Sequence, residues 1–260
     1  MICQTRRVTA SPAPRRTLRQ WGVRVANRTL RRHGLEVRRL DFDRAAAFRS
    51  SSDDIIRRHR GQTQETVRAL REKYETPVFG RVRVWELVER LAQCVDPTDT
   101  KLLCTNQQIH VLQMLAGMER DGITDGDLVL AAVIHDLGKL LLLTDEDPAN
   151  VVCMNTPIGE YGDGVGLDAC TFQWNHDEFG YSRFKDHVPD HISWFIRYHS
   201  IDVDECERLM DARDRRYTEE YFRVLRRYDH DTKSPFDLPT RRMSEYRSVI
   251  EEAFPAPIAF

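Results

Sequence analysis

The chain has 260 residues, of which 41% are hydrophobic and 31% charged, and this composition is typical of a globular protein with one sizeable core. Its formal net charge of −2 excludes a strong overall attraction to nucleic acid, and no apolar run approaches the roughly 20 residues that span a bilayer. The six cysteines form no CxxC pair and no disulfide-like framework, which favours a reducing cytoplasm.

The first 40 residues are rich in arginine and contain no acidic residue before Glu36. We expect residues 1–40 to form a flexible or loosely packed basic segment, a composition also found in organelle-targeting sequences and in segments that lie on anionic surfaces. Residues 41–260 are expected to form the main domain, to bind metal without the basic segment and to act as a monomer.

Apolar residues spaced at three and four predict helices over most of the chain after Phe48, and therefore an all-α fold. In chain order, the expected helices cover residues 53–74, 84–94, 106–120, a segment starting at Thr124, 172–184, 189–199 and 218–228. At Thr124, the pair with Asp127 resembles a capping box, and Ile123 with Leu128 forms a possible hydrophobic staple. The Gly-rich segment TPIGEYGDGVGLDAC is expected to be a long loop that serves a site.

One of the most apolar stretches, AAVIHDLGKLLLL, contains the adjacent residues His135 and Asp136. Burying a charged carboxylate costs several kcal/mol unless a partner compensates it. A single histidine on an apolar helix is more often a satisfied core residue than a ligand. Here, however, similar residues recur on separate predicted helices: His110 in QQIHVLQML, His176 in FQWNHDEF, His199 in SWFIRYHS and Asp229 in RRYDHDTK.

Neutral imidazole and carboxylate are preferred ligands of iron, manganese and zinc, and a buried ion would compensate Asp136. The HD pair together with the recurring histidines therefore predicts a metal centre. The remaining histidines of the main domain are not expected to be ligands, because they lie in polar or Arg-rich settings where solvent satisfies the imidazole: His59, His187, His191 and His230.

The motifs IHVLQ, IHDLGK, QWNHDEFGYSRF, IRYHS and YDHDTK, with FRSS and PIG, resemble the myo-inositol oxygenase family of the HD-domain superfamily from Phe48 to the C-terminus. The resemblance implies an HD-type helical bundle around a dinuclear site with two iron ions. By analogy, one ion is held by His110, His135 and Asp229, the other by His176 and His199, and Asp136 bridges them.

The resemblance also implies substrate contacts at Arg49 in FRSS, Lys139 in HDLGK, Ser200 in YHS and Lys233 in DHDTK. Lys139 stands four residues after His135, so the helical period places both on one face, and we assign Lys139 a catalytic role beside Asp136. The alternative interpretation is an ordinary surface lysine.

The implied reaction uses a mixed-valent Fe(II)/Fe(III) centre and O2 to oxidise an iron-chelating, hydroxylated small molecule, an inositol-like polyol or a derivative, and to cleave a C–C bond. The alternative is a metal-dependent phosphohydrolase of the same superfamily, in which Lys139 and Arg49 would neutralise a phosphate. A third possibility, a scaffold protein that has lost catalysis, predicts missing ligands, and none is missing.

The chain departs from the family in one loop. The family has a Gly-Asp pair whose aspartate contacts the polyol, and aligning VVCMNTPIG places Cys153 and Met154 there. A thioether is a weak acceptor, so we expect unmodified myo-inositol to be a poor substrate and Met154→Asp to improve its use. A shift of the loop by one residue would bring Asn155 to the substrate instead.

Overall fold

The structure is a computed structural model that describes residues 42–103 and 105–260, with the backbone alone for residues 42–50. The expected basic segment and the side chain of Arg49 therefore lie outside the described residues. Within the described part, no helix combines the length and apolarity needed to cross a membrane.

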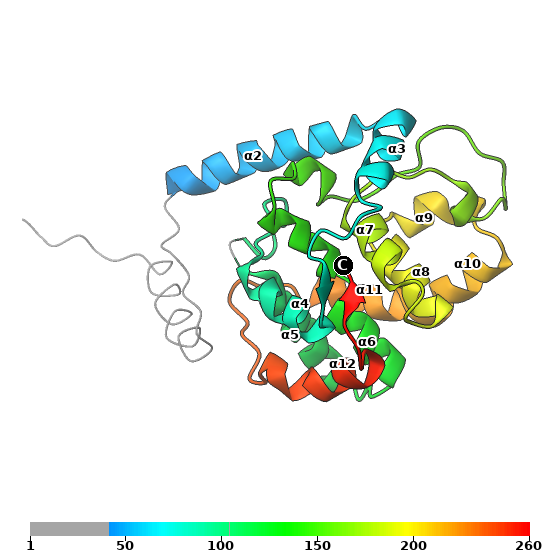
Figure 1. The fold of residues 1–260 in the computed structure, drawn as a ribbon. Coiled ribbons are helices and arrows are strands. Elements are labelled where there is room, and N and C mark those ends of the chain that lie inside the picture. Colours follow the sequence, from blue (N-terminus) through cyan, green and yellow to red (C-terminus); the bar gives the residue numbers. More distant parts are fainter. Residues whose placement is uncertain (1–41, 104) are drawn as a thin grey trace, which may run out of the picture. The chain divides into compact units, whose positions relative to one another are not determined.

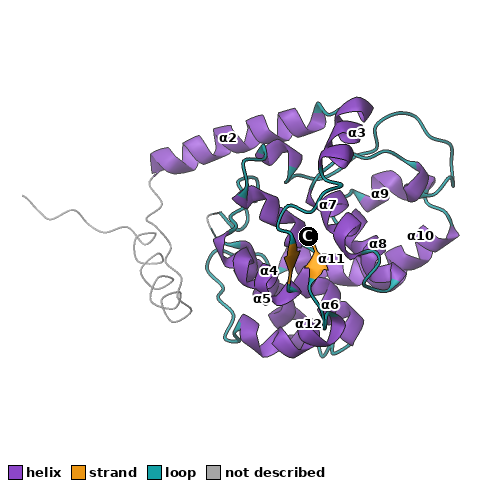
Figure 2. Ribbon diagram, in the orientation of Figure 1, coloured by secondary structure: helices purple, strands orange, loops and turns teal. Residues whose placement is uncertain are grey.

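The described chain is mostly helical, which confirms the all-α prediction (Figures 1 and 2). The α-helices are α2 (Phe42–Arg60), α3 (Gln64–Lys73), α4 (Val84–Arg90), α5 (Gln107–Arg120), α6 (Gly126–Ile134), α7 (His176–Phe184), α8 (Asp190–Tyr198), α9 (Val203–Cys206), α10 (Ala212–Tyr217), α11 (Arg223–Asp231) and α12 (Arg247–Ala253). Two short strands, β1 (Arg81–Val82) and β2 (Ile258–Ala259), pair antiparallel and tie the C-terminal residues to the segment before α4.

The first expected helix, residues 53–74, is in fact two helices. The chain turns after α2 at Gly61 and Gln62, and Thr63 caps α3 by accepting a hydrogen bond from the N–H of Thr66. The prediction was wrong here because the apolar spacing continues across the turn, while the cap that restarts the helix is a single polar residue.

Two other helix boundaries differ from the prediction. The N-cap of α6 is Asp125, whose carboxylate accepts from the N–H groups of Asp127 and Leu128, so the expected capping box at Thr124 does not form. The last expected helix begins earlier, at Ala212, where Asp211 and Asp214 form a capping box, and it reaches α11 through a π-helical turn over Thr218–Phe222. The long loop is confirmed over most of residues 156–170, with one short 3₁₀ turn, Leu167–Ala169.

The core lies where α5, α6, α7 and α8 pack against one another. Its largest fully buried side chains include Trp174, Phe179 and Phe195. A 3₁₀ helix, η3 (Leu137–Leu143), follows α6 and packs closely on α7, because Gly138 and Gly180 face each other at the contact. This packing brings the HD pair next to the N-terminus of α7, where His176 lies.

Candidate metal centre

The HD pair lies where one helix type gives way to another. The α-helix α6 ends at Ile134, His135 is its C-cap residue, and Asp136 precedes η3. His135 and Asp136 therefore lie at the junction between α6 and η3, and both are almost completely buried. Helical periodicity alone would have placed them on a continuing α-helix, so this junction is a feature that the sequence pattern did not predict.

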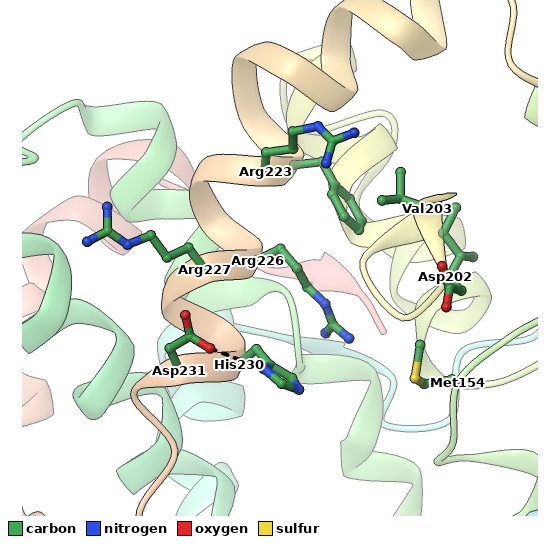
Figure 3. A pocket seen from close by; sticks show the side chains of 10 residues that line it. Met154, Asp202, Val203, Arg223, Arg226, Arg227, His230 and Asp231 are labelled. Atoms are coloured by element: carbon green, nitrogen blue, oxygen red, sulfur yellow. Dashed lines mark hydrogen bonds and ion pairs between the residues drawn. The ribbon is translucent and has the colours of Figure 1, made fainter. Parts of the chain in front are cut away.

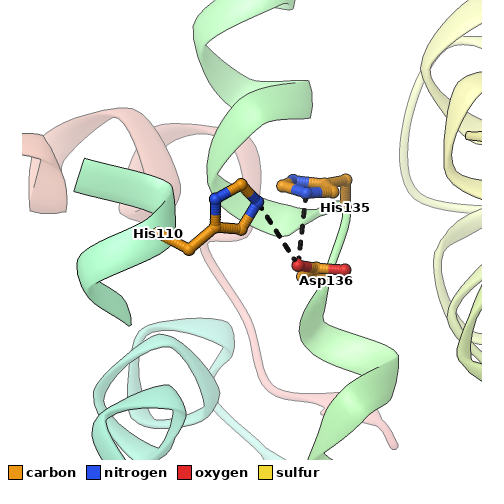
Figure 4. Close-up of side chains that lie close together, drawn as sticks. All are labelled: His110, His135 and Asp136. Carbon is orange, nitrogen blue, oxygen red and sulfur yellow. Dashed lines mark ion pairs between the residues drawn. The ribbon is translucent and has the colours of Figure 1, made fainter. Parts of the chain in front are cut away.

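Both oxygens of the Asp136 carboxylate face histidines. Its Oδ2 lies 3.4 Å from Nε2 of His135 and 3.7 Å from Nε2 of His110, a residue of α5 (Figure 4). Its Oδ1 lies 3.2 Å from Nε2 of His176 and 3.4 Å from Nε2 of His199. The carboxylate thus lies between two pairs of imidazoles, as a bridging ligand of two ions would.

Asp229 on α11 completes the first half of this arrangement, because its Oδ1 lies 3.1 Å from Nε2 of His110. In the second half, Nε2 of His176 and Nε2 of His199 lie 3.2 Å apart. Two imidazole nitrogens at this distance need either a shared proton or a cation between them. The six residues expected from the sequence are therefore brought together, and all six are buried.

Three of the histidines are oriented by backbone carbonyl groups. The Nδ1 atom of His135 lies 2.9 Å from O of Ala132, that of His199 2.9 Å from O of Ile196, and that of His176 2.7 Å from O of Val151. An Nδ1–H that donates to a carbonyl leaves the lone pair on Nε2, which points to the centre. This is the tautomer that binds a metal.

Several buried polar atoms at the centre lie close to other polar atoms but make no well-aligned hydrogen bond within the described residues. They include Nε2 of His110, Nε2 of His135 and Oδ1 of Asp136. An unpaired buried polar group costs about 1–3 kcal/mol, so three such atoms in one place need an explanation. Two compact groups of possible ligand atoms meet at this point, His110–His135–Asp136 and Asp136–His176–His199, and metal ions would satisfy them.

The charges around the site support this interpretation. Burial raises the pKa of the Asp136 carboxyl, but the nearby Lys139 ammonium lowers it, and the net result is a pKa well below the usual range. Burial lowers the pKa of His110 to about 4. The carboxylate is therefore ionised and His110 is neutral at neutral pH, which are the protonation states of metal ligands.

Lys139 is buried and all three of its N–H donors have partners. Its Nζ lies 3.0 Å from Oδ2 of Asp136, 3.2 Å from Oδ2 of Asp96 and 3.1 Å from Oε1 of Gln107. The surface interpretation of this lysine is wrong, and so is the expected face shared with His135, because the turn to a 3₁₀ helix pairs Lys139 with Asp136 at i, i+3.

Lys233 has a similar place on the other side of the site. Its Nζ lies 3.1 Å from Oδ2 of Asp99 and 3.3 Å from Oδ1 of Asp229, which leaves one N–H donor for a further ligand. Each lysine therefore offsets the charge of a metal-facing carboxylate with the help of a second carboxylate.

A family model described as myo-inositol oxygenase matches residues 51–153 and 144–260 of the chain. The chain belongs to the myo-inositol oxygenase family. A probable inositol oxygenase of Oryza sativa subsp. japonica is 28% identical over 240 residues, which cover 77% of this chain and 77% of that protein. Inositol oxygenase 1 of Arabidopsis thaliana is 27% identical over 260 residues, which cover 84% of this chain and 83% of that protein. The inositol oxygenase of Homo sapiens is 24% identical over 241 residues, which cover 78% of this chain and 84% of that protein. The predicted resemblance is confirmed, and with it membership of a family of oxygenases.

Ser200 directly follows His199, and its hydroxyl donates to Oδ1 of Asp177 at 3.0 Å. Oδ1 of Asp177 also lies 3.1 Å from Nε2 of His176 and 3.5 Å from Nε2 of His199, and burial raises the pKa of this carboxyl to about 6. Asp177 is thus a third carboxylate at the centre that the sequence analysis missed. Its signal was present, because NHDEF contains a second adjacent His-Asp pair.

Asn155 is buried, and both ends of its amide have partners. Its Nδ2 donates to Oδ2 of Asp177 at 3.4 Å, and its Oδ1 lies 3.1 Å from Nε2 of His59. These contacts place Asn155 next to Asp177, and its contact with a substrate stays a prediction. Met154, the preceding residue, is 49% exposed.

His59 corrects another expectation. It is fully buried and not solvated, and its Nδ1 lies 2.9 Å from O of Ala149 while its Nε2 meets Asn155. The expectation of a solvated His59 was wrong because the arginines around it lie on the exposed face of α2, whereas His59 lies on the buried face. His191 contacts Asp127 and stacks on Tyr221, away from the centre, and so makes no contact with the expected ligands.

Proposed function

We propose that the chain is a non-haem diiron oxygenase that uses O2 to oxidise and cleave a C–C bond of an iron-chelating, hydroxylated small molecule, an inositol-like polyol or a derivative. The observation that carries this proposal is the Asp136 carboxylate, whose two oxygens face two separate pairs of buried histidines. Two bound iron ions would supply the redox chemistry with dioxygen that ends in C–C cleavage.

The ligand set supports a catalytic rather than a structural site. Three residues face one ion position (His110, His135 and Asp229), two face the other (His176 and His199), and Asp136 is shared. Six protein ligands leave open coordination positions on two ions for substrate oxygens and for O2. Asp177, next to the second pair, is a further oxygen donor that would hold or orient that ion.

The lysines have different parts in the proposed reaction. Lys139 contacts the bridging carboxylate of Asp136 with one N–H donor and is itself held by Asp96 and Gln107, so its part is mainly to hold Asp136 and its charge in place. Lys233 keeps one donor for a substrate hydroxyl. Ser200 keeps its hydroxyl oxygen as an acceptor, because its proton is donated to Asp177.

Metal analysis combined with an oxygen electrode tests the proposal. We expect protein purified without oxygen to contain about two irons per chain, a stoichiometry that follows from the two ligand groups around Asp136, and to consume O2 only when a polyol is added. Asp136→Asn should lose both properties, whereas Asp53→Asn, an exposed change on α2, should keep them.

Two results would contradict the proposal. One is a single zinc ion, or none, in carefully prepared protein. The other is release of phosphate from a phosphate ester without consumption of O2, which would favour the metal-dependent phosphohydrolase of the same superfamily.

A further inference from the structure

A cavity of about 380 Å³ lies along α11 and is lined by three arginines of that helix. One wall is a face of α11 that carries Arg223, Arg226 and His230, spaced at three and four. The opposite wall contains Met154 and Asp202, and Figure 3 shows Arg226 and His230 extending between the two walls. We call this cavity the arginine pocket.

The arginine pocket is joined to the proposed ligands by short paths. Arg226 donates from Nη1 to Oδ2 of Asp229 at 2.6 Å. Ile201, which lines the pocket, follows His199 by two residues and pairs with Asn155, the neighbour of Met154. A molecule in the pocket would therefore lie one side chain away from Asp229.

Arg226 is the least exposed of the three arginines that line the pocket. Arg227 is paired with Asp121 at 3.2 Å. Arg223 is paired with Glu219 at 2.8 Å and with Asp204 at 3.6 Å, both exposed carboxylates. The only carboxylate that Arg226 contacts within the described residues is Asp229, which is also shared with His110 and Lys233. Arg226 donates to this carboxylate from Nη1 alone, and in the described part of the chain its Nε and Nη2 have no hydrogen-bond partner, so these are the donors that it offers to the pocket.

Two carboxylates, Asp202 and Asp231, also line the pocket, and each has a partner of its own; Asp231 lies 3.2 Å from Nδ1 of His230. Asp202 caps α9, where its Oδ1 accepts from the N–H groups of Asp204 and Glu205, so the helix N-terminus offsets part of its charge. His230 lies against the ammonium of Lys101, with ring nitrogens at 3.0 and 3.1 Å from Nζ, so a lysine adds its charge to that of the three arginines.

We propose that the arginine pocket receives an oxyanion group, a phosphomonoester or a carboxylate, that the hydroxylated substrate carries, with Arg226 as its main donor. The inference rests on the proposed function, because it assumes that the substrate binds at the metal centre. A guanidinium matches an oxyanion with two parallel N–H donors, and Met154 supplies the apolar part of the wall that also contains Asp202.

Calorimetric binding measurements on the metal-containing protein test the proposal. The probes are myo-inositol, an inositol monophosphate and inorganic phosphate. We expect the monophosphate to bind at least about tenfold more tightly than myo-inositol, the ratio that one hydrogen bond to a charged group supplies. Inorganic phosphate should compete with the monophosphate and leave the binding of myo-inositol unchanged.

Two variants locate the effect. Arg226→Gln should remove the preference for the monophosphate, and its metal content is measured because Arg226 also contacts Asp229. Met154→Asp leaves that contact intact and adds a carboxylate to the opposite wall, so it should reduce the preference as well. Arg68→Gln, an equal loss of charge on the exposed side of α3, should keep it.

Equal affinities of the unmodified protein for both polyols would overturn the inference. So would an unchanged preference in Arg226→Gln and Met154→Asp, or binding of free phosphate without any advantage for the phosphorylated polyol. These measurements do not depend on turnover. A clear preference for the monophosphate in a protein that never consumes O2 would support the arginine pocket and contradict the proposed oxygenase.

Discussion

Gly138 lies at the closest contact between η3 and α7, and Gly138→Ala should disrupt the second half of the metal centre. A Cβ at this position would lie 2.1 Å from O of His176, 2.8 Å from its C and 3.0 Å from its Cα. These are backbone atoms, and they must retreat by about 1 Å before the contact becomes ordinary. His176 is itself held by Val151, whose carbonyl oxygen accepts from its N–H at 2.9 Å.

The magnitude follows from this geometry. Overpacking usually costs about 1–3 kcal/mol, and a clash between two backbones belongs at the upper end, near 3 kcal/mol. Metal–ligand distances tolerate only about 0.2 Å, so a shift of His176 should also release the ion that it holds with His199. The first group, which contains His110, His135 and Asp229, should keep its ion.

Urea unfolding of metal-free protein measures the loss of stability, and elemental analysis measures the remaining metal. The matched control is Gly126→Ala at the first position of α6, where an added Cβ meets no atom within 4 Å. There the change should be neutral or stabilising by up to about 1 kcal/mol. Gly138→Ala protein with unchanged stability and a full set of ions would refute the reasoning.

Four further outcomes are expected. Asp136→Asn should lose both ions, because an amide cannot bridge them; elemental analysis that finds both ions retained would show that the carboxylate is not shared. Removing the metal should lower the free energy of unfolding by about 2.7 kcal/mol relative to protein with free metal at a hundred times its Kd, and an unchanged melting temperature would contradict this. His191→Ala should leave the metal content unchanged, unlike His199→Ala, because His191 contacts Asp127 outside the centre. Burial raises the pKa of the Cys94 thiol to about 12, so about one molecule in ten thousand carries the thiolate at pH 8; iodoacetamide followed by peptide mapping should find Cys94 unmodified until the protein unfolds.

The helices were largely predictable because each carries its own pattern. The helix α5 begins after Asn106, whose side chain accepts from the N–H of Ile109, and the sequence predicted this boundary correctly. The turn between α2 and α3 was missed, since apolar spacing does not record where a polar residue restarts the helix. The π-helical turn before α11 was missed for a related reason: the pattern of apolar residues does not distinguish it from an α-turn.

The residues that contact the candidate ligands and their lysines from behind were not predicted from the sequence. Asp96 and Asp99 come from the segment between α4 and α5, where nothing in the local pattern indicates that each meets a buried lysine. His59 and Asn155 meet across 96 positions of the chain, so their contact depends on how α2 packs and not on either neighbourhood. Such partners are selected by tertiary packing, which a short motif does not record.

The orientation of the expected metal ligands was easier to predict than the lining of the cavity, because the two depend on different parts of the fold. His135 and His199 are each oriented by a carbonyl three residues back on their own helix, so the local fold is enough to aim them. Arg226 and Met154 meet across a cavity, and their arrangement depends on the loop before Asn155 as well as on α11. A change in that loop can therefore alter which molecule binds without moving a ligand. This is why the six expected ligands could be predicted from the sequence, whereas the placement of Met154 and Arg226 across the cavity could not.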